Sequence, residues 1–394
     1  MALFVYAAGL MALFAADFVV SVLLTDGQIA EWAVLRSLIG ITAVIPLIGL
    51  DQVLVRSPQS SGRLLRQLLF QVPPLGLLVG VILETLGFVA HWWLGAGIAM
   101  GSAGSLIFFH YFRSHREWLL SQVAQQGWKL AMLAVILWLA YSETQASLVL
   151  LGIALLLVTD LFALFFVLRK PPARLHRQMP ERIRVLYSIG VRFMVNGLFL
   201  ALSVYAEQLV VNALGSTQQA ALYFSCATFF LFPFSFLNGY IAFRIGPYVR
   251  DKRASFISNL RQYRWTIPIG VAAYSVALNM FGWLGWTLTN PSVGDLDHGL
   301  QVIFGLVGFV RVLYVIPSGY VGVFGKPKQH DLFILLQVLS MAAVVVGFLA
   351  LREVGVPLLY AVAISSGANW ALRLLVGLRV MWIIERDLNA ADAK

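Results

Sequence analysis

Nine charged residues that could bind a substrate or an ion lie within or beside long apolar stretches of this 394-residue chain. A charge in such a stretch is costly unless it faces water or a partner, so each is a candidate functional residue. Five are the cations Arg36, Arg192, Arg244, Arg311 and Arg373, and a tenth charged residue, Lys129, lies in a similar position. The other four are the acids Asp17, Glu84, Asp160 and Glu207.

The arginines suit the binding of a multiply anionic substrate. A guanidinium group is planar and binds phosphate through two parallel hydrogen bonds, which makes arginine the favoured residue for such groups. Arg311 lies about mid-span, where its charge cannot reach the interface. Arg192, Arg244 and Lys129 lie near predicted cytoplasmic ends, where pairing with a carboxylate or extension toward the headgroups is the alternative.

The acids are candidates for coupling transport to an ion gradient. A carboxylate in a low-dielectric cavity can bind H⁺ or Na⁺ in one conformation and release it in another. Asp17 and Glu207 fall at comparable depths of the two halves of the chain and form the preferred pair. A structural salt bridge is the alternative for each. Three amides on the predicted seventh and eighth spans, Gln208, Asn212 and Asn238, can contact sugar hydroxyls or bond helix to helix.

Composition and charge place all these residues in a polytopic membrane protein. Hydrophobic residues make up 60% of the chain and charged residues 12%. Of the 28 Lys and Arg, 21 fall in alternate polar breaks and only Arg352 falls in the opposite set, so the positive-inside rule orients the chain with both termini in the cytoplasm. This clustering explains the net charge of +10 without nucleic acid.

The apolar runs predict about twelve membrane-spanning helices in an all-α fold, because each span needs roughly 20 residues. They form an N-terminal six-helix lobe (1–170), a basic cytoplasmic connector (171–186), a C-terminal six-helix lobe (187–383) and a cytoplasmic tail (384–394). The predicted spans are 2–24, 29–50, 67–90, 96–112, 124–140, 146–168, 187–213, 219–248, 263–288, 300–324, 330–351 and 357–383.

The two halves begin alike, and six helices return the chain to its starting side, so the halves are predicted to be a parallel repeat. Prolines inside the predicted spans, among them Pro46, Pro233 and Pro317, are expected to permit bends.

Four segments of the second half resemble the seventh and eighth helices of the Wzx-type polysaccharide flippases of the multidrug/oligosaccharidyl-lipid/polysaccharide (MOP) exporter superfamily. They are Glu207-Gln-Leu-Val-Val-Asn-Ala-Leu-Gly, Ala220-Ala-Leu-Tyr-Phe-Ser, Phe232-Pro-Phe-Ser-Phe-Leu-Asn and Ile245-Gly-Pro-Tyr-Val. Ile29-Ala-Glu-Trp-Ala-Val-Leu-Arg-Ser-Leu and Leu47-Ile-Gly-Leu-Asp-Gln-Val-Leu-Val-Arg are similar to the family's second helix.

This resemblance implies two lobes around a cavity that opens alternately to each side. It implies movement of undecaprenyl-diphosphate-linked oligosaccharide repeat units from the cytoplasmic to the outer leaflet of the bacterial inner membrane, for O-antigen (lipopolysaccharide) or other surface polysaccharide synthesis. A polysaccharide polymerase and a chain-length regulator are then the expected protein partners. Drug or organic-cation exporters of the same superfamily are the alternative, and an O-antigen polymerase is the enzymatic one.

No catalytic residue or metal site is predicted. The chain has no Walker-type phosphate loop, no HExxH motif and no Asp-rich metal motif, and its six histidines are scattered. Apart from an H⁺ or Na⁺ gradient, no cofactor is expected.

Overall fold

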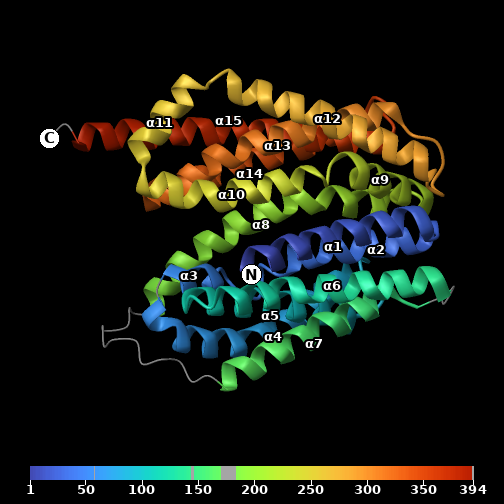
Figure 1. Ribbon diagram of the computed structural model, residues 1–394, viewed down its shortest axis with the longest axis horizontal. Helices are drawn as coiled ribbons and strands as arrows, with labels where there is room; N and C mark the ends of the chain where they lie inside the picture. Colours follow the sequence, from blue (N-terminus) through green and yellow to red (C-terminus); the bar gives the residue numbers. More distant parts are fainter. Residues whose placement is uncertain (57, 143–145, 170–182, 393–394) are drawn as a thin grey trace. The chain divides into compact units, whose positions relative to one another are not determined.

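The computed structural model describes residues 1–56, 58–142, 146–169 and 183–392, and these residues form helices joined by turns, without a β-strand. Ten helices of the described part are long and apolar enough to cross a membrane, or eleven if one bent pair counts as a single span. The predicted all-α polytopic fold is therefore confirmed. By contacts the chain divides into two compact units, unit 1 (Met1–Ala221) and unit 2 (Leu222–Lys394) (Figure 1).

Unit 1 holds the predicted first six spans and the seventh. Its helix α8 packs on α2 and α3, so by contacts unit 1 extends beyond the predicted first lobe. Most of the predicted connector 171–186 lies outside the described residues, and the two-lobe division stays a prediction. The helices are α1 (Ala2–Leu23), α2 (Asp26–Thr42), α3 (Leu50–Arg56), α4 (Ser61–Thr85), α5 (Trp92–Ser114), α6 (Trp118–Ser142), α7 (Leu148–Arg169) and α8 (Ile183–Leu214), with a short 3₁₀ turn at Pro58–Ser60.

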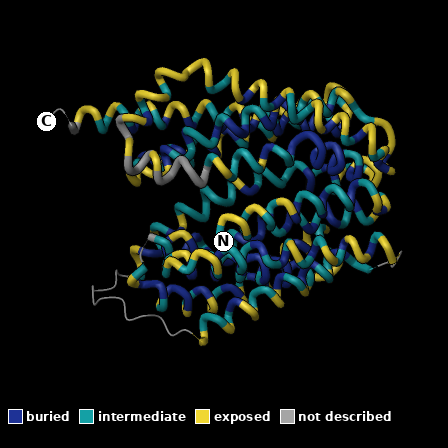
Figure 2. The backbone as a smooth tube through the Cα atoms, in the orientation of Figure 1, coloured by how far each residue is buried: buried dark blue, intermediate teal, exposed yellow. Residues whose placement is uncertain are grey.

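Helix α5 is the centre of unit 1, with helices α2, α3, α4, α6 and α7 packed on it. Small residues let these helices approach closely, as is usual in membrane bundles. Fourteen of the 23 residues of α5 are buried, most of them glycine, alanine or serine along its first half (Figure 2).

The second predicted span, 29–50, is not one continuous helix. Helix α2 ends at Thr42, and turns lead to the short α3. Pro46 lies in these turns, and Ile48 and Gly49 have positive φ angles of 49° and 68°. A side chain at Gly49 would overlap the backbone carbonyl of Gly190 on α8, so glycine is required for both the conformation and the approach.

A polar side chain satisfies the carbonyl groups that this break leaves outside a helix. Gln71 of α4 donates its amide N–H to the carbonyl oxygens of Pro46 and Leu47, at 3.0 and 3.2 Å. The hydroxyl of Tyr187, on α8, donates to Gln71 Oε1 at 2.7 Å. The break is therefore tied to α4 and α8, because buried backbone carbonyls need partners.

Unit 2 contains the remaining spans. Its helices α13 and α14 pack along α15, and α10 and α12 pack on α13. Helix α9 crosses the boundary between the units. The bounds are α9 (Thr217–Phe230), α10 (Phe234–Asp251), α11 (Arg253–Gln262), α12 (Thr266–Thr289), α13 (His298–Phe324), α14 (Pro327–Glu353) and α15 (Leu358–Asp392).

The second span of the second half is also broken. Helices α9 and α10 meet at Pro233 with a bend of 54°. Each half therefore interrupts its second predicted span near a proline, at Pro46 and Pro233, as expected from the loss of a backbone donor. Pro317 lies inside the continuous helix α13.

Candidate transport sites in the two units

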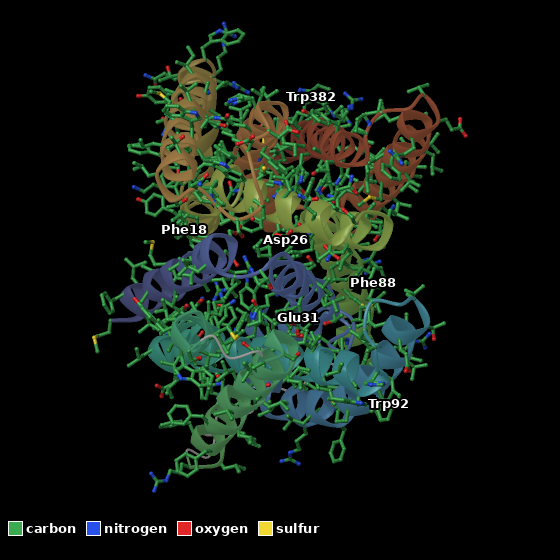
Figure 3. All side chains as sticks on the ribbon, turned by 90° about the vertical axis from the view of Figure 1, so that its right-hand side faces the viewer. Phe18, Asp26, Glu31, Phe88, Trp92 and Trp382 are labelled. Carbon is green, nitrogen blue, oxygen red and sulfur yellow. The ribbon has the colours of Figure 1, made fainter. Side chains whose placement is uncertain are left out.

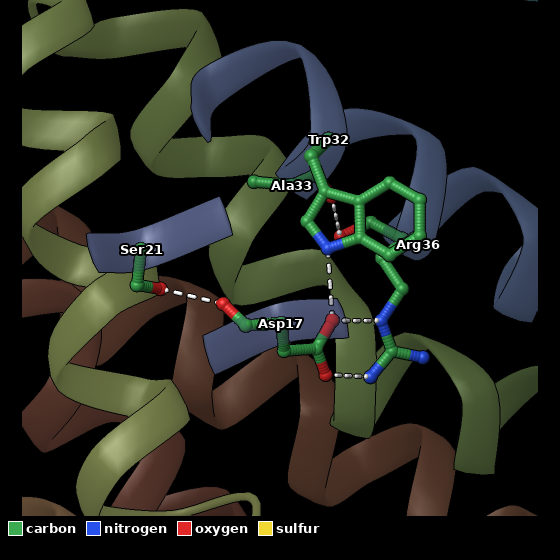
Figure 4. Close-up of polar contacts among 6 residues, drawn as sticks. Asp17, Ser21, Trp32, Ala33 and Arg36 are labelled. Carbon is green, nitrogen blue, oxygen red and sulfur yellow. Dashed lines mark hydrogen bonds and ion pairs between the residues drawn. The ribbon is translucent and has the colours of Figure 1, made fainter. Parts of the chain in front are cut away.

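The carboxylate of Asp17 in unit 1 is only 1% exposed and accepts three side-chain hydrogen bonds (Figure 4). Arg36 donates from Nε to Oδ1 at 3.0 Å and from Nη2 to Oδ2 at 2.8 Å. Trp32 donates from its indole nitrogen to Oδ1 at 2.8 Å. Trp32 and Arg36 are four residues apart on α2, so both side chains lie on the face that packs against α1.

The tight turn between α1 and α2 brings these residues together. Thr25 and Gln28 form a capping box that starts α2 immediately after α1 ends at Leu23. Asp17 therefore forms a salt bridge, which was the structural alternative to ion coupling for this residue. Two-point binding by Arg36 is the stronger form of such a pair.

A second cation lies near this pair. Lys129 of α6 donates to Gln126 Oε1 at 2.7 Å and interacts electrostatically with Asp17 and Arg36. Gln126 is 1% exposed and packs against Gly9 on α1, where a side chain would not fit. The cluster of Asp17, Arg36 and Lys129 therefore carries one acid and two cations.

The other predicted acids differ in their surroundings. Glu84 is exposed in the last turn of α4, because the neighbouring Leu83 occupies the face of that turn that packs on Gly95 of α5. Glu207 is half-buried on α8. Asp160 lies on α7 against Gly104 of α5, and its Oδ1 atom is buried without a hydrogen bond among the described residues.

Glu31, which was not among the predicted site residues, binds the start of α7. Glu31 Oε1 accepts hydrogen bonds from the Ser147 hydroxyl at 2.5 Å and from the Val149 backbone at 3.2 Å, which caps the start of α7. It lines a cavity of about 670 Å³ together with Thr25 and Gln28, at the end of unit 1 that faces the viewer in Figure 3. Its position in the segment Ile29-Ala-Glu-Trp, among apolar residues, was the available signal.

A buried acid–imidazole pair at the opposite end of unit 1 was also missed. Asp51 of α3 and His110 of α5 are each 5% exposed, with Oδ2 and Nε2 3.3 Å apart. Gln52 donates its amide to Asp51 at 2.9 Å and lies 3.1 Å from His110 Nε2. These residues are far apart in the sequence, and only the packing of α3 on α5 brings them together.

Two of the three predicted sugar-contact residues bond helix to helix. Gln208 donates to Asn212 Oδ1 at 2.7 Å and to the carbonyl of Ala220 at 3.2 Å, and Asn212 donates to the carbonyl of Ala30 on α2 at 3.2 Å. Gln208 and Asn212 therefore form the helix-to-helix hydrogen bonds that were the alternative to sugar contact. Asn238 is half-buried on α10, with its Oδ1 buried and unbonded among the described residues.

The predicted cations Arg311 and Arg373 lie together in unit 2, 8% and 1% exposed. The guanidinium carbon of Arg311 lies 4.8 Å from the ring centre of Trp370, and that of Arg373 lies 5.7 Å from the same ring. Arg373 also donates from Nη2 to the hydroxyl oxygen of Tyr314 at 3.2 Å, and so does the Gln337 amide at 3.3 Å. Cation–π contacts stabilise these arginines but leave their charge in place.

The helices around this arginine pair carry few acids. Helices α12 and α13 have none. The acids of α10, α14 and α15 lie near the helix ends, at Asp251, Asp331, Glu353, Glu385, Asp387 and Asp392. Arg311 and Arg373 therefore lie in the middle of helices whose own acids are near the helix ends.

The two remaining predicted cations lie apart from this pair in the sequence. Arg192 is half-buried in the first third of α8, and Arg244 lies in α10 with a side chain outside the described residues. The structure therefore brings together Arg311 and Arg373, and Asp17 and Arg36, out of the predicted set.

Taken together, the helices define a polytopic membrane protein with charged sites buried in its helix bundles, and solved structures show the same fold. The chain is similar to the MATE multidrug transporter DinF-BH, with a TM-score of 0.61 and 14% identity, covering 96% of this chain and 94% of that one. It is similar to MATE in complex with MaD3S, with a TM-score of 0.59 and 13% identity over 97% and 94% of the two chains.

The chain is also similar to a third solved structure. It is a MOP superfamily transporter from Pyrococcus furiosus, described as having a binding pocket of reversed polarity that suggests a different function, with a TM-score of 0.55 and 12% identity over 97% and 94% of the chains. No protein-family model and no curated protein matches the sequence. The chain thus has the fold of the MATE transporters of the MOP superfamily.

Proposed function

We propose that this protein is a secondary transporter of the MOP superfamily that exports an organic solute by alternating access. The fold carries the proposal, because the likeness to MATE multidrug transporters extends over nearly the whole of both chains. The same likeness favours the exporter over the lipid-linked oligosaccharide flippase and over a polymerase, and it supports a non-enzymatic role. The bacterial inner membrane, with both termini in the cytoplasm, is the proposed location.

A flippase for a polyprenyl-diphosphate-linked glycan is the second candidate. The buried pair Arg311 and Arg373 supports it, because two guanidinium groups in the middle of helices whose acids lie near the helix ends suit a diphosphate better than an organic cation. A polysaccharide polymerase and a chain-length regulator are proposed partners only in this case.

For the energy source we propose an H⁺ or Na⁺ gradient. Asp17 with Arg36 forms a charged pair that a bound ion or anionic substrate could rearrange, since either would compete for one of the two partners.

Deletion of the gene in its host separates the two candidates. Lipid-linked glycans are extracted and assigned to a leaflet, surface polysaccharide is assayed, and sensitivity to a panel of cationic and anionic drugs is measured. An exporter gives unchanged glycans with increased drug sensitivity. A flippase gives single repeat units on the inner leaflet with loss of surface glycan, and single units on the outer leaflet would contradict both candidates.

Reconstitution then tests transport directly. Proteoliposomes with an imposed proton or sodium gradient are loaded with a rhodamine dye as a cation or with fluorescein as an anion. Gradient-dependent movement of either dye supports an exporter and reports the preferred charge. Movement of neither dye, together with normal drug resistance in the deletion strain, would overturn the exporter proposal.

A further inference from the structure

A carboxylic acid occupies a position at which helix α7 packs into a row of glycines on α5. Each glycine of α5 faces one residue of α7: Gly97 faces Ile153, Gly101 faces Leu156 and Gly104 faces Asp160. A side chain at any of the three glycines would overlap its partner on α7. Two of the three α7 residues are apolar, as expected for a close helix contact, and the third is an acid.

No side chain among the described residues donates a hydrogen bond to Asp160 or forms an ion pair with it. Its Oδ1 atom is buried and accepts no hydrogen bond within the described part of the chain. The helices packed on α7 are α5, α6 and α2. None of the charged or titratable groups of these helices bonds to Asp160. These groups are His110, Tyr111 and Arg113 on α5, Lys129 and Tyr141 on α6, with Glu117 just before α6, and Asp26, Glu31 and Arg36 on α2.

The comparison with Asp17 shows what an ionised acid requires in this bundle. Asp17 receives three hydrogen bonds, two of them from a guanidinium group. Asp160 is half-buried in the middle of α7, but its Oδ1 atom is enclosed against Gly104 of α5 and has no donor among the described residues while α5 and α7 are in contact. A carboxyl group with an enclosed oxygen that has no donor is favoured as the neutral acid.

We propose that Asp160 is a proton-binding site of unit 1, occupied while α5 and α7 are packed together. Separation of these two helices would let water reach the carboxyl group and release the proton. Proton binding and helix packing would then be linked, since the ionised form favours the open contact and the neutral form the closed one. This proposal concerns the proton alone and holds for either candidate substrate.

Dicyclohexylcarbodiimide tests the protonation state directly, because it labels carboxyl groups that are protonated in apolar surroundings. The full-length protein in proteoliposomes is labelled over a series of pH values and mapped by mass spectrometry. We expect label at Asp160 that declines as the pH rises, and none at Asp17, whose oxygens are bonded to Arg36. Absence of label at Asp160, or label that does not change with pH, would overturn the proposal.

Thermal unfolding provides a second measurement. Because protonation stabilises the closed contact, stability is present at low pH and is lost as the pH rises. We expect the melting temperature to fall with rising pH in the unsubstituted protein, and to fall less in Asp160→Asn, which keeps the shape and stays neutral. Glu84→Gln, a change to an exposed acid, is the matched control and should leave the profile unchanged. An identical pH profile in Asp160→Asn would contradict the proposal, and should that variant fail to fold, the labelling result decides.

Discussion

Asp17 on α1 and Arg36 on α2 form a two-point ion pair, with both carboxylate oxygens bonded at 2.8 to 3.0 Å. The acid is almost fully buried and the guanidinium is 16% exposed. This pair links the first two helices, so two of the predicted transport charges are paired with each other. Transport through Asp17 would therefore require a change in its bonding with Arg36.

Removing the acid should be more harmful than removing both charges. Asp17→Asn leaves Arg36 charged in a buried position, and we expect a loss of about 3 kcal/mol of unfolding free energy, the size typical of breaking a buried pair. The double variant Asp17→Asn with Arg36→Met should recover part of this loss. Denaturation in detergent measures both, and a double variant less stable than Asp17→Asn would contradict the expectation.

Gly49 should tolerate no side chain. In Gly49→Ala the new methyl group would overlap the Gly190 carbonyl, and the left-handed backbone itself costs about 1 kcal/mol for a non-glycine residue. We expect little correctly folded protein by size-exclusion chromatography. Gly27→Ala is the matched control at the start of α2, because nothing lies within 4 Å of the new methyl group. Equal yields of the two variants would show that α8 can move away from Gly49.

Gln71 should stabilise the break between α2 and α3. In Gln71→Leu the carbonyl group of Pro46 loses its donor, whereas that of Leu47 keeps the hydrogen bond from the Leu50 backbone N–H at 2.9 Å. An unsatisfied buried carbonyl group costs about 1 to 3 kcal/mol. We expect faster proteolysis within residues 43–49. Tyr187→Phe removes only the bond from the tyrosine hydroxyl and should have a smaller effect. The reverse order of the two effects would argue against this role for Gln71.

Arg311 should be required for transport and dispensable for folding. Arg311→Ala removes a buried cation above Trp370, and we expect loss of transport of an anionic substrate with unchanged protein level. Arg352→Ala, at an exposed arginine at the end of α14, should transport normally. Proteoliposome uptake with quantified protein gives the comparison. Normal transport by Arg311→Ala would remove Arg311 from the mechanism.

Much of the fold could be predicted from local sequence. Runs of apolar residues set the helices, because a backbone in lipid must satisfy its hydrogen bonds within each segment. The two broken spans were less predictable. Pro46, Pro233 and Pro317 all lie inside apolar runs, but only the first two coincide with breaks, because a proline bends or breaks a helix according to how neighbouring side chains satisfy the freed carbonyl groups.

The sequence by itself determined that the chain is a helical membrane protein and that its buried charges are the residues to test, because hydropathy and the cost of a charge in lipid are local properties. Only the tertiary structure decided which charges meet. It paired Asp17 with Arg36, placed Arg311 and Arg373 on one indole ring, and left Asp160 against a glycine. These outcomes depend on how helices rotate and pack, and apolar residues on every face of a helix hide that rotation from the sequence.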